Sequence, residues 1–196
     1  MAANKKPQRR GIYLLPNLFT TAGLFAGFYA IIAAIRGDFE SAAIAIFIAM
    51  IMDGFDGRIA RMTNTQSDFG AEYDSLADMV SFCLAPALVM YQWALLDMGK
   101  VGWMAAFIYA ACGALRLARF NTQVGIADKR YFQGLASPAA AACIAGWIWV
   151  GTSNHVDLDI ASKISLPLTF ICGILMVSTL RYHLSLTHIS EPTRRS

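Results

Sequence analysis

The sequence predicts an all-α polytopic membrane protein with six membrane-spanning helices. Of its 196 residues, 57% are hydrophobic and 15% are charged, whereas a soluble globular domain is about half apolar and a quarter charged. The apolar residues gather in six long segments, and a membrane-spanning helix needs about 20 such residues. The formal net charge of +3 is too small to indicate a nucleic-acid partner. This composition excludes a disordered chain and favours a protein that lies in a membrane.

Each of the six predicted spans is an apolar run bounded by polar residues. The first follows a basic N-terminus that has no small-residue cleavage site after a short apolar core, so a retained helix is predicted rather than a signal peptide. The second is short, but its helix can continue past Asp53 toward Met62. The third begins with carboxylates, so its first turns must lie in protein or water, and a polar loop over residues 121–133 separates the fourth span from the fifth. The predicted spans are residues 14–35, 39–52, 73–96, 101–117, 135–151 and 160–180.

The positive charges predict which side of the membrane each segment occupies. With a cytoplasmic N-terminus and alternating spans, thirteen of the sixteen Lys and Arg residues lie in inside segments. The other three, Arg36, Lys100 and Lys163, lie in outside loops. Because cytoplasmic segments of membrane proteins carry an excess of Lys and Arg, we expect both termini in the cytoplasm.

Acidic residues concentrate where the second predicted span ends and the third begins. Asp53 and Asp56 stand three residues apart and Asp74 and Asp78 four apart, so each pair shares one face of a helix. If the two helices face each other, four carboxylates converge near the membrane surface and repel one another strongly. One or two divalent cations would relieve that repulsion. Oxygen ligands without a nearby His or Cys favour Mg²⁺, Mn²⁺ or Ca²⁺ over zinc.

A purely structural interpretation of these acids is also open. They could form a solvated salt-bridge patch with Arg58 and Arg61. The functional interpretation is favoured, because ionisable residues at the ends of membrane helices are costly and usually serve function. Two further acids in the region, Asp68 and Glu72, lie off the shared face and are expected to be solvated.

One continuous pattern, D-x-x-D-G-x-x-A-R-x8-G-x3-D-x3-D, runs through the acidic region in full. It resembles the defining motif of the CDP-alcohol phosphatidyltransferase family, whose members carry a six-transmembrane-helix core. The match fixes eight positions over 26 residues, which makes the motif highly specific. The matched residues are Asp53, Asp56, Gly57, Ala60, Arg61, Gly70, Asp74 and Asp78.

The resemblance implies a site with two metal ions, Mg²⁺ or Mn²⁺, and a pocket for the CDP part of a CDP-linked lipid. It implies that the four aspartates bind metal and that Asp78 also acts as the general base. Residues 15–20 are similar to the P-N-x-x-T sequence at the family's first helix, in which the Asn faces the nucleotide, although Pro is common at helix starts in general. The residues expected to bind metal are Asp53, Asp56, Asp74 and Asp78, and those expected to bind CDP are Asn17, Gly57, Ala60, Arg61 and Gly70.

Three further stretches resemble membrane-integral bacterial phosphatidylserine synthases. They are residues 113–121, 132–138 and 181–182, and the second departs from the usual G-L-P-S-P by having Ala136. The resemblance implies that acceptor-binding side chains lie here, and Arg116 and Arg119 would hold the anionic part of the substrate. The two arginines also fit a structural interpretation as positive anchors at a helix end. The expected acceptor-binding residues are Arg116, Arg119, Asn121 and Ser137.

The resemblance implies that the chain transfers the phosphatidyl group of CDP-diacylglycerol to L-serine, giving phosphatidylserine and CMP. It further implies a homodimer in a bacterial inner membrane, with the active site at the cytoplasmic face. Alternatives within the family use glycerol 3-phosphate or an inositol phosphate as the acceptor. An ion-coupled transporter is a distant alternative. Transporters place acids near the bilayer midplane, often in two repeated halves, whereas this chain has one acidic cluster and no repeat.

The sequence is expected to hold one domain. Residues 1–183 form the phosphatidyltransferase membrane domain, and residues 184–196 follow as a polar tail without a span. Because phosphatidylserine synthases of this type usually continue into further apolar helices, we expect this tail to be a truncated or non-native end.

The charge count leads to a test of topology. A cysteine introduced beside Lys129, after replacement of the four native cysteines, is expected to react with a membrane-impermeant thiol reagent only from the cytoplasmic side. A cysteine beside Lys100 is the control and should react only from outside. Labelling near Lys129 in intact cells would overturn the predicted orientation.

Overall fold

A computed structural model describes residues 14–62, 67–123, 131–178 and 181–183. This part of the chain is almost entirely helical. The α-helices are α1 (Leu14–Ile35), α2 (Phe39–Met62), α3 (Asp68–Asp78), α4 (Ala85–Met90), α5 (Lys100–Gln123), α6 (Ser137–Ser153) and α7 (Leu158–Val177). The π-helical segment η1 (Met79–Leu84) joins α3 to α4, and a second π-helical segment, η2 (Tyr91–Leu95), and the 3-10 turn η3 (Leu96–Met98) follow α4, so that these elements form one rod. The two strands are β1 (Tyr131–Gln133) and β2 (Arg181–His183).

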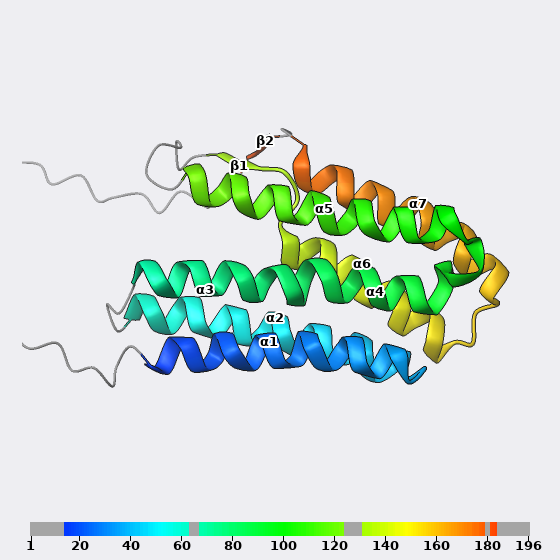
Figure 1. The fold of residues 1–196 in the computed structure, drawn as a ribbon, viewed down its shortest axis with the longest axis horizontal. Helices are drawn as coiled ribbons and strands as arrows, with labels where there is room; N and C mark the ends of the chain where they lie inside the picture. The colour runs from blue at the N-terminus through cyan, green and yellow to red at the C-terminus, as the bar shows by residue number, and fades with distance from the viewer. Residues whose placement is uncertain (1–13, 63–66, 124–130, 179–180, 184–196) are drawn as a thin grey trace, which may run out of the picture.

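The helices run side by side along the long axis of the molecule (Figure 1). One half holds α1, α2 and the rod that begins with α3, and the other half holds α5 and α7. Helix α6 packs against both α2 and α7 and so connects the halves. The end of α2, the start of α3 and the start of α1 lie at one end of the molecule, together with the end of α5 (Figure 1).

The helices largely follow the predicted bounds. Helix α1 covers the first predicted span, and α2 continues past Asp53 to Met62 as expected. The third helix begins at Asp68, and α5 continues to Gln123, which shortens the predicted polar loop. The strands were not expected: β1, inside that loop, pairs antiparallel with β2, with Phe132 opposite Tyr182. A strand of three residues is too short to show a periodic pattern in the sequence.

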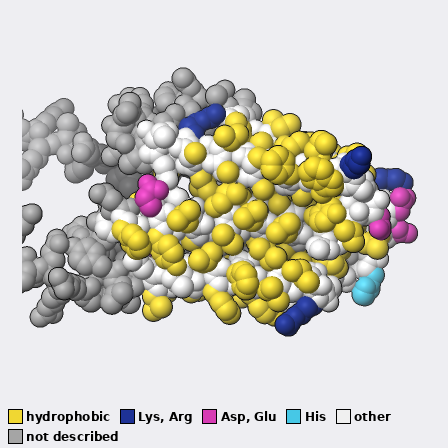
Figure 2. Space-filling model, in the orientation of Figure 1, with side chains coloured by type: hydrophobic (Ala, Val, Ile, Leu, Met, Phe, Trp, Pro, Cys, Tyr) yellow, Lys and Arg dark blue, Asp and Glu magenta, His cyan; other side chains and the backbone are white. Residues whose placement is uncertain are grey.

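The described helices are those of a membrane protein. Four of them are long and apolar enough to cross a membrane: Asn17–Ile35, Phe69–Met98, Lys100–Thr122 and Leu158–Val177. Figure 2 shows apolar side chains over the middle of one face and charged side chains gathered toward the ends. Helices α2 and α6 are not among the four, so the count of six spans stays a prediction. The predicted polar tail, 184–196, lies outside the described residues.

Helices α1 and α2 pack closely and bury several alanines. Ala30 and Ala33 of α1 and Ala42 and Ala49 of α2 are each at most 3% exposed. Side chains of a single carbon let two helix backbones approach closely, which is how helices commonly associate in membranes. The close approach fixes α2, and with it the carboxylates near its end, against α1.

Two polar contacts fix the rod that begins with α3. The backbone N–H of Gly70 donates to the Ser67 hydroxyl at 3.0 Å, which caps the first turn of α3. Further along the rod, Ser81 donates to the carbonyl of Gly23 in α1 at 3.1 Å. The second contact needs a close approach at Gly27, where an added Cβ would lie 2.7 Å from Cα of Ser81.

That close approach predicts that Gly27→Ala destabilises the protein. The new methyl group would also lie 2.6 Å from the Ser81 hydroxyl, so α1 and η1 must move apart, and overpacking of this kind costs about 1–3 kcal/mol. Thermal unfolding in detergent should show a lower midpoint than for the wild-type protein. Gly146→Ala is the matched control, because its Cβ would meet only the ring of Phe47, at 4.0 Å. Equal midpoints for the two variants would contradict the prediction.

Candidate metal centre

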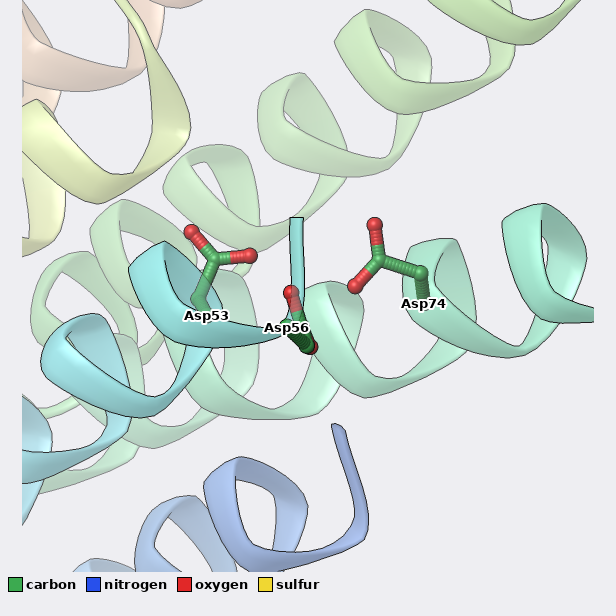
Figure 3. A group of neighbouring side chains, drawn as sticks. All are labelled: Asp53, Asp56 and Asp74. Carbon is green, nitrogen blue, oxygen red and sulfur yellow. The ribbon is translucent and has the colours of Figure 1, made fainter. Parts of the chain in front are cut away.

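Three of the four predicted carboxylates meet between α2 and α3. Asp53 and Asp56 project from α2 and Asp74 from α3, with Asp56 between the other two (Figure 3). One oxygen from each lies within 4.8 Å of the others. Magnesium and calcium bind oxygen ligands at about 2.0–2.6 Å, so one ion can contact all three groups after small adjustments. The set of oxygen donors fits a hard divalent ion.

A small cavity lies among these carboxylates. Besides the three aspartates, its lining includes Thr20 and Gly23 of α1 and Asp78 and Ser81 of the rod that begins with α3. Its volume of about 10 Å³ gives room for about one water molecule or small ion. Asp78 therefore lines the same cavity as the three clustered aspartates, one helical turn beyond Asp74, but it is not one of the group within 4.8 Å.

Asp56 is held by a residue to which the sequence analysis assigned no role. The Thr20 hydroxyl of α1 donates to Asp56 Oδ2 at 2.9 Å, and both side chains are buried. A hydrogen bond to a carboxylate stabilises its charged form and fixes its orientation. The signal was present in the sequence, because Thr20 is the Thr of the P-N-x-x-T pattern, but that pattern does not say which partner the hydroxyl meets.

The salt bridge found among the described residues lies apart from the three carboxylates. It joins Lys163 to Asp159 within α7, and Arg58 is exposed. The side chain of Arg61 lies outside the described part, as does that of Asp68. Glu72 is exposed, as expected. Crowded carboxylates of this kind are costly without a counter-charge, and for Arg58 the salt-bridge interpretation receives no support.

Two of the predicted CDP-binding residues are neighbours at the outer end of this site. A Cβ on Gly70 would lie 3.6 Å from Asn17 Oδ1, so α1 and α3 meet closely there. Beside them the hydroxyls of Thr21 and Tyr73 lie 2.8 Å apart. Gly57 is exposed, and the side chains of Ala60 and Arg61 lie outside the described part.

The four predicted acceptor-binding residues form three separate contacts. Arg116 Nη1 donates to the Ser137 hydroxyl at 2.9 Å, which brings those two residues together. Asn121 Nδ2 donates to the hydroxyl of Ser75 at 3.1 Å, and Ser75 directly follows Asp74. Arg119 Nη1 donates to the carbonyl of Val177 at 3.0 Å, a typical contact of a cation with a helix C-terminus.

The end of α7 holds the segment that leads into α6. The N–H of Leu135 donates to the carbonyl of Leu175 at 2.9 Å. Gly134, just before it, has a φ of +75°, and a Cβ there would lie 2.6 Å from the carbonyl oxygen of Met176. A glycine is needed here both for its backbone conformation and for the close approach. Together with Arg119, this segment anchors the start of α6, and hence Ser137, to α7.

Comparison with known proteins identifies the family. Residues 13–182 match the CDP-alcohol phosphatidyltransferase family. The chain belongs to this family. The two aspartates of its D-x-x-D element, in α2, meet the first aspartate of its D-x-x-x-D element, in α3, in Figure 3. The second aspartate of that element, Asp78, lines the same cavity.

Curated members of the CDP-alcohol phosphatidyltransferase family resemble the chain over most of its length. A CDP-diacylglycerol–serine O-phosphatidyltransferase of Helicobacter pylori (strain 26695) is 38% identical over 171 residues, which cover 87% of this chain and 72% of that protein. A protein of the same name from Bacillus subtilis (strain 168) is 34% identical over residues that cover 90% of this chain and 94% of that protein. Another from Mycobacterium tuberculosis (strain H37Rv) is 43% identical over residues that cover 72% of this chain and 52% of that protein.

The carboxylate geometry predicts that Asp74→Asn weakens metal binding. Mn²⁺ binding to the purified protein, followed by the paramagnetic resonance of free Mn²⁺, should weaken by about tenfold or more, because one charged ligand is lost. Glu72→Gln is the control, since Glu72 is exposed on the same helix and should bind Mn²⁺ as the wild type does. Wild-type affinity in Asp74→Asn would remove Asp74 from the metal centre.

Proposed function

We propose that this chain is a CDP-diacylglycerol–serine O-phosphatidyltransferase, which transfers a phosphatidyl group to the hydroxyl of L-serine and releases CMP. The observation that carries the proposal is the agreement among its relatives. Proteins from Helicobacter, Bacillus and Mycobacterium that are 34–43% identical to the chain over the aligned residues all bear this name. The oxygen-rich cavity between α2 and α3 suits the chemistry, because displacement at a diphosphate requires neutralised phosphate oxygens.

The proposed reaction is a substitution at phosphorus. The serine oxygen forms a bond to the phosphorus that carries diacylglycerol, and the bond from that phosphorus to the CMP oxygen breaks. Asp78 accepts the proton of the serine hydroxyl, for which it must lie within hydrogen-bond reach. Asp53, Asp56 and Asp74 would hold Mg²⁺ or Mn²⁺ together with Asp78. When bound, such ions neutralise the diphosphate and stabilise the leaving CMP.

Asn17, Gly57, Ala60, Arg61 and Gly70 are proposed to bind the CDP moiety. The close approach of α1 to α3 at Gly70 supports a nucleotide near this end of the cavity, where backbone and small side chains leave access. An arginine offers a fork of N–H groups that suits phosphate oxygens. In this proposal Arg61 supplies that fork to the diphosphate.

The acceptor is proposed to bind on the opposite wall, formed by α5 and the start of α6. Arg116 and Ser137 are in contact there, and a guanidinium can hold the serine carboxylate by two parallel bonds. Arg119 uses one N–H group on Val177 and has others to offer, while Asn121 reaches α3 through Ser75. Glycerol 3-phosphate and an inositol phosphate would also suit arginines, so the choice of serine rests on the relatives' names.

The enzyme is proposed to lie in a bacterial inner membrane as a homodimer, with six spans, both termini cytoplasmic and its site at the cytoplasmic face. The excess of Lys and Arg in the segments assigned to the inside supports this orientation. A lipid donor and a water-soluble acceptor can meet only at the membrane surface, which agrees with carboxylates near the end of α2. Membership of the family argues against the transporter alternative.

Release of CMP from CDP-diacylglycerol tests the proposal. The purified protein with Mn²⁺ or Mg²⁺ should release CMP when L-serine is added and should stop in excess chelator. Glycerol 3-phosphate and myo-inositol phosphate should give no release above the background without an acceptor. Release with glycerol 3-phosphate but not with serine would overturn the acceptor, and full turnover in chelator would overturn the metal requirement.

The role of Asp78 has its own test in the same assay. Asp78→Asn should lower turnover by about 10²–10⁴-fold, because an amide cannot accept the hydroxyl proton. The matched control is Asp97→Asn, an exposed residue in η3 of the same rod, which should keep wild-type turnover. Near-normal turnover in a folded Asp78→Asn variant would exclude Asp78 as the base.

A further inference from the structure

The helix that carries Asp74 and Asp78 leaves α-helical geometry directly after Asp78. Over η1 the backbone is π-helical, and the N–H of Ala85 donates to the carbonyl of Val80, five residues back. Such a segment contains one residue more than an α-helix of the same number of turns. The helix before it, α3, is therefore rotated about the helix axis relative to the helix after it, α4. Short π-helical segments in proteins occur frequently at functional sites.

The sequence supplies a reason for the irregularity. In an α-helix the carbonyl of Phe82 would accept from the N–H of residue 86, but residue 86 is Pro and has no N–H. In an apolar environment a carbonyl left without a donor is costly. Tyr109 of α5 supplies one, because its hydroxyl donates to the Phe82 carbonyl at 3.1 Å. Both Tyr109 and Phe82 are at most 1% exposed.

Two neighbouring helices, α1 and α5, contact η1 from different sides. On the α1 side, Ser81 donates to the Gly23 carbonyl and packs on Gly27. On the α5 side, the Tyr109 hydroxyl holds Phe82, while Cys83 lies so close to Gly113 that a Cβ there would collide with its sulfur. Thus η1 contacts α1 through Ser81 and α5 through Phe82 and Cys83.

The segment η1 also lines the carboxylate cavity. Ser81 and Phe82 line the cavity together with Asp74 and Asp78. Beyond η1, α4 is fixed in the core, where Val89 and Met90 are fully buried. Because α4 is fixed, the rotation at η1 determines the direction in which the side chains of Asp74 and Asp78 point from α3.

We propose that Tyr109 is a positioning residue of the site: by holding the π-helical segment η1, it orients Asp78 and Asp74 toward Asp53 and Asp56 across the cavity. The effect on turnover rests on the proposed function, whereas the effect on metal binding does not. A Tyr109 that served stability alone would affect the unfolding midpoint without changing either the metal affinity or the rate of the folded protein.

The test removes the hydroxyl of Tyr109 and keeps its aromatic ring. Tyr109→Phe is compared with Ser165→Ala, which removes another hydrogen bond between helices, from Trp147 Nε1 of α6 to the hydroxyl of the buried Ser165 of α7 at 2.9 Å. Mn²⁺ binding without substrates and kcat in the CMP-release assay are measured on folded protein. In Tyr109→Phe we expect both Mn²⁺ affinity and kcat to fall by about tenfold, with the KM for serine within about twofold of wild type because the α5–α6 wall keeps its contacts. Ser165→Ala should match the wild type in all three quantities.

Each outcome decides the proposal. Wild-type Mn²⁺ affinity in Tyr109→Phe overturns it, and so does an equal loss in Ser165→Ala. If the wild-type protein releases no CMP with serine, the proposed function fails, and Mn²⁺ affinity alone decides the role of Tyr109. If Tyr109→Phe does not fold, Ser81→Ala, which releases η1 on the α1 side, takes its place with the same expected loss of Mn²⁺ affinity.

Discussion

Three carboxylates held within 4.8 Å of one another inside a mostly apolar bundle constrain the rest of this structure. Their repulsion is strengthened by the low dielectric of the surroundings, so the force that holds their helices together must come from elsewhere. Helix α1 provides it without contributing an acidic residue of its own. It packs along α2 and buries several alanines, its Gly27 leaves room for Ser81 of the rod that begins with α3, and its Thr20 donates to Asp56. The helix that carries no charge thereby determines where the charges meet.

Two groups of side chains with opposite character lie on two pairs of helices. The carboxylates lie on α2 and α3, the acidic wall, and Arg116 contacts Ser137 on α5 and α6, the basic wall. Asn121 and Ser75 connect the two walls by a hydrogen bond beside Asp74. In the proposed function, the anionic acceptor would meet the basic wall, and the diphosphate would meet the carboxylates with their divalent ions, a cationic centre.

Sequence reasoning reached the helices and the carboxylates but not what orients them. The i, i+3 spacing of Asp53 and Asp56 is a local property, and it correctly predicted that the two side chains share one face of α2. That face meets Asp74 of α3, as expected. The Thr20 hydrogen bond and the Tyr109 contact with Phe82 join residues 36 and 27 positions apart, and no periodic pattern reports such pairs. Pro86 was visible in the sequence as a missing donor in the third span, but only the fold shows which side chain replaces it. The pairing of β1 with β2 was missed for the same reason, since the segments are short and lie far apart in the chain.

The anchoring of Gly134, Leu135 and Arg119 to the end of α7 has a consequence for the order in which the protein matures. A membrane protein enters the bilayer as it is synthesised, from its N-terminus onward. The acidic wall is complete once the third helix has been made, whereas the basic wall receives its anchors only when the carbonyls of Leu175 and Val177 arrive with the last helix. A nascent chain can therefore bring its clustered carboxylates together well before the segment around Ser137 is anchored. A ribosome that stops within α7 would leave Gly134, Leu135 and Arg119 without their contacts on that helix.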